Sequence, residues 1–268
     1  MKVVLIGAGN LATQLGKSLR LTGQNILQLY SRTEESASCL AAKLGCDYTT
    51  DLSALRTDAE VYIASLKDDA LLQLIPQMVA GKCDDALFLH TAGSVPMDVW
   101  KGHARHYGVL YPMQTFSKQR DVDFSTIPVF VEASSDADLQ RVRTMASALS
   151  GSVTVASSEQ RRYLHLSAVF ACNFANHMFT VSERLLQENG IDFSCMYPLI
   201  REMVNKVLDG MSPGDAQTGP AVRYDHGVMD KHVELLRSHP VWQEIYKETS
   251  KSIHDDKLRL DEDKSAGL

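Results

Sequence analysis

The beginning of the chain carries the feature that most constrains its fold. An apolar run, Lys2–Ile6, leads directly into the G-x-G-x-x-A pattern Gly7–Ala12, and the helix-period segment Leu11–Leu21 follows. In such a strand–turn–helix unit the first glycine permits the tight turn, the second lets a pyrophosphate approach the backbone, and the small last residue allows close packing. The helix N-terminus adds free N–H groups and the positive end of its dipole. This context favours a dinucleotide-binding site over a merely structural glycine turn. Its predicted residues are Gly7, Gly9, Asn10 and Leu11.

The end of the second apolar run indicates which dinucleotide is bound. Where an NAD site carries Asp or Glu for the ribose 2′-hydroxyl, this chain has Tyr30-Ser31-Arg32-Thr33. Ser31 and Thr33 can donate hydrogen bonds to a 2′-phosphate, and the planar guanidinium of Arg32 can pair with it. An ordinary solvated surface charge is the alternative role for Arg32. We therefore predict NADP(H) as the cofactor, with Ser31, Arg32 and Thr33 at its 2′-phosphate.

Strand-like and helix-like segments alternate through the first part of the chain. This pattern, with nearly continuous apolar strands, is typical of a parallel sheet covered on both faces. From Ser158 onward no strand-like run recurs, and apolar residues spaced by three and four predict helices. The expected fold is α/β, a Rossmann parallel-sheet domain over residues 1–156 followed by an all-α domain over residues 157–268. The predicted strands are Lys2–Ile6, Ile26–Tyr30, Cys46–Thr49, Val61–Ser65, Ala86–Thr91, Gly108–Tyr111, Pro128–Glu132 and Val153–Ala156.

Composition limits the partners and the compartment. The chain has 268 residues and a formal net charge of -6, which argues against a nucleic-acid binder because phosphate neutralisation needs clustered Lys and Arg. Its five cysteines are scattered, odd in number and without a C-x-x-C pair, so we expect buried thiols in a reducing compartment and no metal site. The first apolar run is too short for a signal peptide, and no run reaches the ~18 residues of a membrane span. We expect a cytoplasmic protein with no membrane partner.

Several motifs together resemble a known family. The Gly7–Ala12 turn, Ser31–Thr33 and Ile63–Asp69 resemble the superfamily of 6-phosphogluconate dehydrogenase, 3-hydroxyisobutyrate dehydrogenase and pyrroline-5-carboxylate reductase. Further motifs look like those of bacterial Rossmann-like NADP oxidoreductases with a helical C-terminal domain of unknown function, some of which are labelled deazaflavin-dependent by similarity. These further motifs are His90–Ser94, Tyr111–Phe116, Gln217–Asp225 and His232. The resemblance implies the fold, the cofactor and a homodimer, and it supplies no substrate.

Loops that follow three strands are expected at one edge of the sheet, where open parallel sheets bind ligands. By the resemblance, Leu66 and Lys67 lie along the nicotinamide ribose, whereas Asp68 and Asp69 could simply cap the next helix.

The other two of these loops supply further candidates. His90 ends a strand before a glycine-containing turn, where it could polarise a carbonyl or shuttle a proton. A hydrogen-bonded core histidine is the alternative. Tyr111-Pro112-Met113 resembles the His-Pro-Met of prephenate dehydrogenases with Tyr in the place of His, and Gln114 beside it is a candidate substrate contact.

The helix-period segment after Ser158 carries polar residues on one face. At 3.6 residues per turn, His165, Asn173 and His177 share a face of an otherwise apolar helix, which suggests one wall of a cleft between the domains. In the hydroxyacid dehydrogenases of the resembled superfamily, this helix brings a catalytic Lys followed four residues later by Asn. If Asn173 is that Asn, Val169 occupies the Lys position, and His165 is the nearest replacement. The candidate catalytic residues are therefore His165, Asn173, His177 and His90.

The last motif suggests how a substrate is held. Thr218-Gly219-Pro220 predicts a turn that opens a helix, and this helix N-terminus with Arg223 would hold a carboxylate or phosphate. Pairing of Arg223 with Asp225 or Glu202 is the alternative.

The leading hypothesis is an NADP(H)-dependent oxidoreductase that acts on a small anionic substrate between its two domains, in a homodimer formed through the helical domain. Two alternatives stay open. One is a non-catalytic NADP(H) sensor, which the missing Lys favours. The other is hydride exchange between NADP(H) and a deazaflavin-type carrier, which needs little acid–base machinery.

Overall fold

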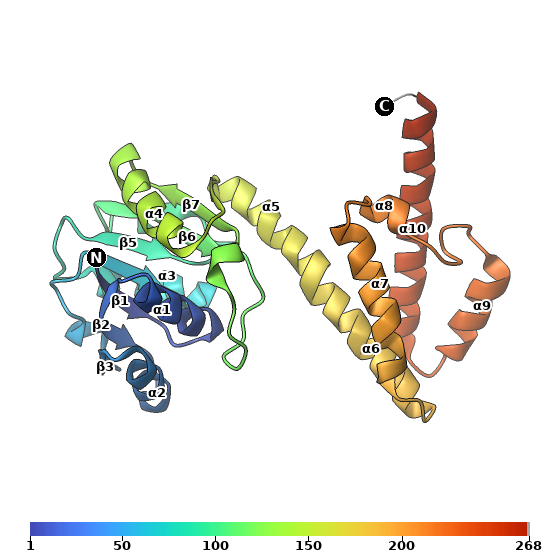
Figure 1. Ribbon diagram of the computed structural model, residues 1–268, viewed down its shortest axis with the longest axis horizontal. Coiled ribbons are helices and arrows are strands. Elements are labelled where there is room, and N and C mark those ends of the chain that lie inside the picture. Colours follow the sequence, from blue (N-terminus) through green and yellow to red (C-terminus); the bar gives the residue numbers. More distant parts are fainter. Residues whose placement is uncertain (267–268) are drawn as a thin grey trace. The chain divides into compact units, whose positions relative to one another are not determined.

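The computed structural model describes residues 1–266, and its contacts divide the chain into two compact units. The first, Met1–Phe174, is called the sheet unit, and the second, which begins at Ala175, the helical unit. An eight-stranded sheet with the order β3-β2-β1-β4-β5-β6-β7-β8 forms the core of the sheet unit (Figure 1). The strands are β1 (Lys2–Ile6), β2 (Asn25–Tyr30), β3 (Asp47–Thr49), β4 (Val61–Ala64), β5 (Leu87–His90), β6 (His106–Pro112), β7 (Val129–Ala133) and β8 (Val153–Val155). The expected Rossmann sheet followed by a helical region is thereby confirmed, and each strand overlaps a predicted run.

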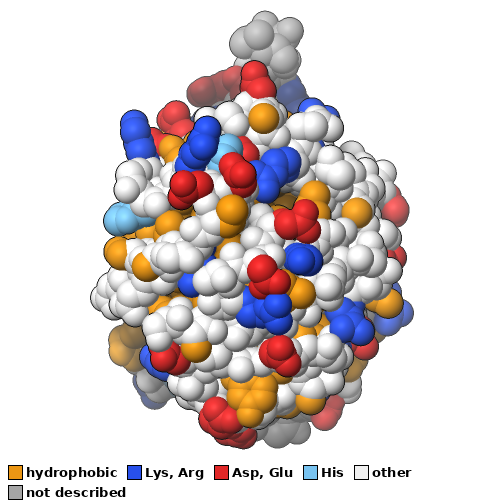
Figure 2. Space-filling model, turned by 90° about the vertical axis from the view of Figure 1, so that its left-hand side faces the viewer, with side chains coloured by type: hydrophobic (Ala, Val, Ile, Leu, Met, Phe, Trp, Pro, Cys, Tyr) orange, Lys and Arg blue, Asp and Glu red, His pale blue; other side chains and the backbone are white. Residues whose placement is uncertain are grey.

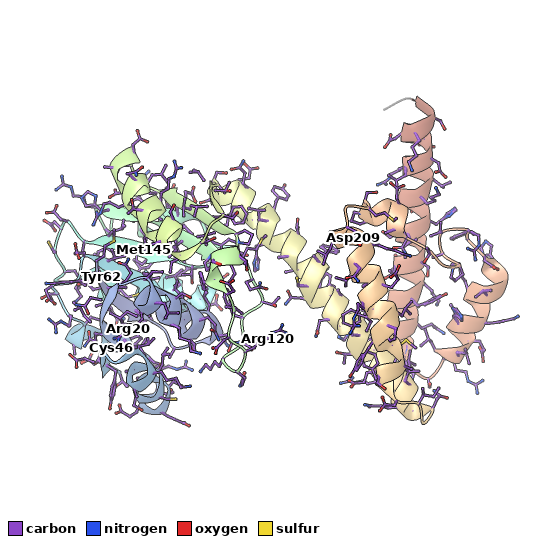
Figure 3. The ribbon with its side chains drawn as sticks, in the orientation of Figure 1. Arg20, Cys46, Tyr62, Arg120, Met145 and Asp209 are labelled. Carbon is purple, nitrogen blue, oxygen red and sulfur yellow. The ribbon has the colours of Figure 1, made fainter. Side chains whose placement is uncertain are left out.

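Two apolar clusters fill the two faces of the sheet. Because successive strand side chains point to opposite faces, Val3 and Leu5 join the cluster that holds Met145, whereas Val4 and Ile6 join the one that holds Tyr62 (Figure 3). The helices that cover these faces are α1 (Asn10–Leu21), α2 (Glu34–Leu44), α3 (Asp68–Val79) and α4 (Asp136–Leu149).

One strand pair departs from the predicted parallel arrangement. β7 runs antiparallel to β6, with Leu110 opposite Val131. Parallel neighbours need a crossover, usually a helix, but residues 113–128 contain only the short 3-10 helix Phe124–Thr126. The chain therefore turns back beside β6, and the N–H of Met113 donates to the carbonyl of Pro128. A crossover through α4 then makes β8 parallel to β7.

α5 (Ser158–Ala168) follows β8 and begins with a capping box. The hydroxyl of Ser157 accepts from the N–H of Gln160, whose side chain accepts from the N–H of Ser157. α5 continues into a π-helical turn, Val169–Phe174. By their contacts, α5 and this turn both belong to the sheet unit. The predicted domain boundary after residue 156 thus falls between β8 and α5. The α-helices described in the helical unit are α6 (Ala175–Glu188), α7 (Tyr197–Leu208), α8 (Pro213–Ala216), α9 (His226–Leu235) and α10 (Pro240–Ala266).

Surface features of the described residues bear on the compositional expectations. No helix among residues 1–266 combines the length and apolarity that crossing a membrane requires. On the face shown in Figure 2, basic and acidic side chains are interspersed. All five cysteines are free thiols, but the expectation that they are buried is wrong. Four are exposed, and only Cys46 is partly buried, which raises the pKa of its thiol to about 11.

Candidate functional site

The turn between β1 and α1 is shaped for a close approach from outside. Gly7 has φ 120°, and a Cβ there would lie 2.1 Å from the carbonyl oxygen of Ser65, so no other residue fits. A Cβ on Gly9 would meet nothing within 4 Å, which leaves open space beside the start of α1. The N-cap makes no side-chain hydrogen bond, and the first turn holds no acidic residue. This N-terminus therefore fits a pyrophosphate.

The loop between β2 and α2 fits a 2′-phosphate. Arg32 and Thr33 are exposed, whereas Ser31 is buried at 9% exposure. Thr33 is the N-cap of α2 and its hydroxyl makes no capping bond, so the hydroxyl is available to a ligand. Glu34 and Glu35 stand in the first turn and would oppose an anion. The hydroxyl of Tyr48 donates to the Glu34 carboxylate at 2.6 Å and engages one of these charges.

The loop after β4 touches the same turn. The Leu66 side chain lies 3.4 Å from where a Cβ on Gly7 would stand, and Lys67 is the N-cap of α3. No side chain caps α3. Asp68 instead accepts a hydrogen bond from the hydroxyl of Ser94. The alternative that Asp68 caps α3 is therefore wrong.

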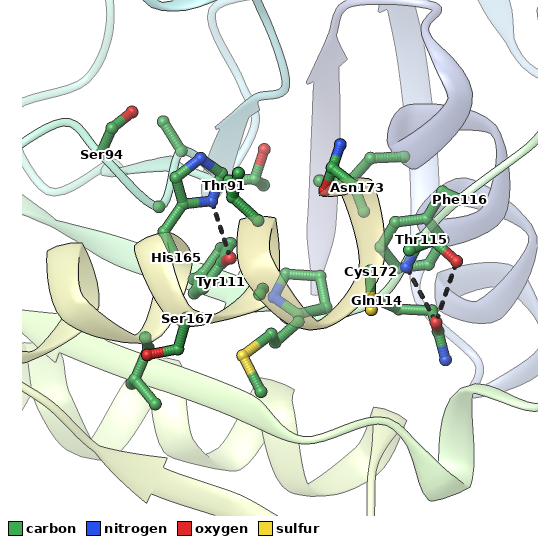
Figure 4. A pocket seen from close by; sticks show the side chains of 18 of the residues that line it. Thr91, Ser94, Tyr111, Gln114, Thr115, Phe116, His165, Ser167, Cys172 and Asn173 are labelled. Atoms are coloured by element: carbon green, nitrogen blue, oxygen red, sulfur yellow. Dashed lines mark hydrogen bonds between the residues drawn. The ribbon is translucent and has the colours of Figure 1, made fainter. Parts of the chain in front are cut away.

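A cavity of about 520 Å³ lies within the sheet unit, at the carboxyl ends of β5 and β6 (Figure 4). Leu11 from the first turn of α1 contributes to its lining, so the cavity adjoins the helix N-terminus described above. Asp68, the first residue of α3, also lines it, and the rest comes from three segments: residues 91–94 after β5, residues 111–116 at the end of β6, and residues 164–173 of α5 and the π-turn.

Tyr111 and His165 lie side by side in the lining of this cavity and are joined by a hydrogen bond (Figure 4). The Tyr111 hydroxyl lies 3.2 Å from Nδ1 of His165, and the two rings meet edge to face. Burial raises the pKa of Tyr111, and the positive charge of Arg161 lowers it by a smaller amount. The neutral hydroxyl can therefore donate to Nδ1, which leaves the proton of a neutral imidazole on Nε2.

Our sequence analysis did not select Tyr111 as a site residue. Its place in the Tyr-Pro-Met motif was the available signal.

Arg161 holds the loop after β5 against α5. Its side chain is 1% exposed and donates to the carbonyls of Ala92 and Val95, at 3.3 and 2.5 Å, and to the Glu132 carboxylate. The loop and the helix then approach so closely that a Cβ on Gly93 would lie 2.9 Å from the His165 side chain. Sequence reasoning missed Arg161 and Glu132, because their partners are far away along the chain.

His90 lies apart from the cavity lining. It is fully buried, with its ring 6.4 Å from that of Trp100, and Nδ1 accepts from the N–H of Ala92 at 3.2 Å. Burial, and then the charge of Arg161, lower the pKa of His90 to about 3. This neutral, buried imidazole matches the alternative of a core histidine better than an acid–base role.

The π-turn determines on which face of the helix Asn173 lies. On a regular α-helix, at about 100° per residue, Asn173 would lie about 80° round the axis from His165. Hydrogen bonds of a π-turn run i→i+5, so each of its residues turns through a smaller angle. The turn thereby brings Asn173 back toward the face of His165, and both line the cavity. π-turns of this kind are frequent at functional sites.

The remaining candidates are divided between the two units. Gln114 lines the cavity, and its side-chain oxygen accepts from the N–H of Thr115. His177 (in α6) and Arg223 belong to the helical unit, where both are exposed. The predicted turn at Thr218–Pro220 is present, but the helix does not start there. It starts at His226, because Asp225 caps it by accepting from the N–H of Val228.

Comparisons with known proteins confirm the resemblance. Residues 2–90 match the family model described as "NADP oxidoreductase coenzyme F420-dependent", and residues 127–253 match DUF2520, a domain of unknown function. A Bacteroides fragilis crystal structure described as a "putative NADP oxidoreductase" is 53% identical, covers 95% of this chain and 98% of its own, and has a TM-score of 0.91. No curated protein matches the chain.

Two more distant structures share the fold. An imine reductase from Myxococcus stipitatus in complex with NADP⁺ is 16% identical, with a TM-score of 0.64 over 100% of this chain and 95% of that one. A 1-pyrroline-5-carboxylate reductase from Streptococcus pyogenes is also 16% identical, with a TM-score of 0.63 over 95% and 98%.

Proposed function

The chain belongs to the family of the Bacteroides fragilis protein, and on this premise we propose that it is an NADP(H)-dependent oxidoreductase that acts on a small molecule in the cavity beside Tyr111 and His165. One observation carries the proposal. Leu11, from the helix turn that fits the pyrophosphate, lines the same cavity as the Tyr111–His165 pair. Cofactor and chemistry would thus share one edge of the sheet, as in other open α/β folds.

The cofactor-binding residues divide by the part of the dinucleotide that they contact. The backbone from Gly7 to Leu11 would bind the pyrophosphate, and Ser31, Arg32 and Thr33 would bind the 2′-phosphate. Leu66 and Lys67 would lie along the nicotinamide ribose. When bound, NADPH supplies a hydride to the substrate.

His165 is the proposed proton carrier, and Tyr111 is a positioning residue. The Tyr111 hydroxyl fixes Nδ1 of His165, so that Nε2–H can exchange a proton with the substrate heteroatom. Asn173 and Gln114, which line the same cavity, would orient the substrate through their amide groups.

A titration of both cofactors with the Arg32→Ala variant tests the proposal. A charged hydrogen bond contributes about 1.5–3 kcal/mol, so this variant should bind NADPH roughly 10- to 100-fold more weakly and NADH almost unchanged. Arg105→Ala, at an exposed position just before β6, is the control. Equal losses for both cofactors would show that Arg32 does not contact the 2′-phosphate.

Turnover is tested by following NADPH absorbance with small carbonyl and imine compounds. NADPH binding without any turnover would favour the sensor hypothesis instead. Transfer to a deazaflavin carrier is a second candidate, supported by the coenzyme named in the matched family model and by Val169 at the expected Lys position. Turnover that requires the carrier would support it.

We also propose that the chain forms a homodimer through its helical unit. Large apolar side chains of α7 are exposed, among them Leu199 at 65% and Leu208 at 75%. Such side chains gather at protein interfaces.

A further inference from the structure

The cavity beside Tyr111 and His165 has an unusual charge balance for a site expected to take an anion. No Lys or Arg is among its lining residues, and Asp68 is the only carboxylate. Tyr111, His165 and Cys172 are the other lining residues with ionisable side chains. Our expectation of an anionic substrate rested on Arg223, which belongs to the helical unit.

Asp68 is placed to meet a ligand. It does not cap α3; one carboxylate oxygen accepts from the hydroxyl of Ser94, and the other makes no hydrogen bond within the described residues. The side chain is exposed and lines the cavity. Among the lining residues a carboxylate substrate would meet this charge and no guanidinium or ammonium group, whereas a cationic nitrogen would find in Asp68 the acceptor it needs.

The proton transfers that the cavity can support also favour a cationic substrate. Reduction of a ketone leaves an alkoxide that must be protonated by the site as the hydride arrives. The raised pKa of Tyr111 makes its hydroxyl a poor acid, and Val169 takes the place of the expected Lys. His165 is the remaining proton carrier of the cavity, and a protonated imine already carries its proton, so its hydride step does not have to coincide with a proton transfer from His165.

We propose that the substrate is a small protonated imine without a carboxylate group, whose nitrogen is bound by Asp68. This inference rests on the proposed NADP(H) oxidoreductase function. The iminium carbon accepts the hydride of NADPH, the π pair of the C=N bond becomes the lone pair of a neutral amine, and NADP⁺ is left. His165 exchanges the nitrogen proton before or after this step.

Binding of a matched pair of amines to the NADP⁺ complex tests the charge assignment without turnover. Pyrrolidine and L-proline share a ring and differ by one carboxylate. Calorimetric titration should show pyrrolidine binding at least tenfold more tightly than proline. Asp68→Asn should weaken pyrrolidine at least tenfold and leave proline unchanged or tighter. Asp69→Asn, a neighbouring carboxylate outside the cavity lining, should change neither.

A second pair tests the reaction. With NADPH, 1-pyrroline should be reduced with a higher kcat/KM than 1-pyrroline-5-carboxylate, and Asp68→Asn should reverse this order. Tighter binding of proline, equal effects of Asp68→Asn on both ligands, or no binding of pyrrolidine to a complex that holds NADP⁺ would overturn the inference and leave the oxidoreductase proposal standing. Binding of NADP⁺ alone is measured before the amines are added. If NADP⁺ itself does not bind, the proposed function is contradicted instead.

Discussion

His90 and His165 show how one residue type takes two roles according to its surroundings. His90 ends β5 inside the core, where the cost of burying a charge keeps its ring neutral. His165 is exposed on α5 and bonds to Tyr111 at the cavity. Sequence analysis gave both as acid–base candidates, His90 because it ends an apolar strand and His165 because it lies on a polar helix face near the position of the missing Lys. Burial and partners, which depend on the whole fold, separate them.

Replacement of His165 should reveal its part in turnover. A general acid or base contributes typically 10²–10⁴-fold in rate, so His165→Ala should lose about that much while NADPH affinity falls little, because the cofactor contacts lie elsewhere. Tyr111→Phe should lose less than His165→Ala, since Tyr111 only positions the ring. Steady-state kinetics with the substrate found in the NADPH screen, beside NADPH titration, measures both. Full activity of His165→Ala would mean that Tyr111 and His165 contribute to packing and not to proton transfer.

His90 should make stability fall as the pH falls. Its folded-state pKa of about 3 lies below the unfolded value of 6.5, so the unfolded chain binds the proton first. The contribution is complete above pH 6.5 and declines below it, by about 1.4 kcal/mol for each pH unit, down to about pH 3.

Urea unfolding at pH 7.5 and 5.5 measures this decline. His90→Asn keeps an acceptor near Nδ1 without a titrating ring, so it should be less stable at pH 7.5 but should lose about 1.4 kcal/mol less between the two pH values. His103→Asn, at an exposed position, should behave like the unmodified chain. A parent-like pH dependence of His90→Asn would show that the ring is accessible to protons when folded.

At the scale of elements, sequence patterns predicted which segments form strands better than how they associate. All eight strands overlap predicted runs, and the inner strands do so because burial on both faces produces a nearly continuous apolar sequence; β3 and β8, at the sheet edges, are mostly exposed. The antiparallel direction of β7 depends on the missing crossover after β6, and the π-turn has no periodic signature. The cofactor turn was predictable because its chemistry lies in one short motif. Arg161 was not, since its partners come from two distant segments, the loop with Ala92 and Val95 and the strand with Glu132.

Arg161 should therefore contribute to stability as the residue that joins α5, β7 and the loop after β5. Removal of one partner from a buried ion pair costs about 3–5 kcal/mol because the other charge is left unpaired. Arg161→Met should approach the lower figure, since Glu132 is partly exposed and keeps the hydrogen bonds of Ser158. Urea unfolding measures the loss.

Two further variants make this measurement specific. Arg161→Met/Glu132→Gln should regain part of the stability, because no unpaired carboxylate remains. Arg162→Met, one residue along and exposed, should change the free energy of unfolding by less than about 0.5 kcal/mol. A loss of that small size for Arg161→Met would show that the network is not needed to hold the loop on α5.

At the scale of the whole molecule, the apolar surface of the helical unit remains to be explained. Leu199, Met203 and Val207 recur every four residues along α7, and each is more than 40% exposed. Residues at this spacing share one helix face. Burying that face against a second copy is the arrangement expected for a homodimer, whose interfaces resemble a core cut in half.

The dimer prediction has a direct test in solution mass. Light scattering should give about twice the monomer mass of 29.6 kDa at micromolar concentration. Met203→Glu places a charge in the centre of the apolar face, so it should shift the mass toward the monomer because burying an unpaired carboxylate is costly. Arg201→Glu lies on the opposite side of α7 and should keep the dimer. A mass of 29.6 kDa that does not change with concentration would exclude the dimer. A dimer that resists Met203→Glu would move the interface away from α7.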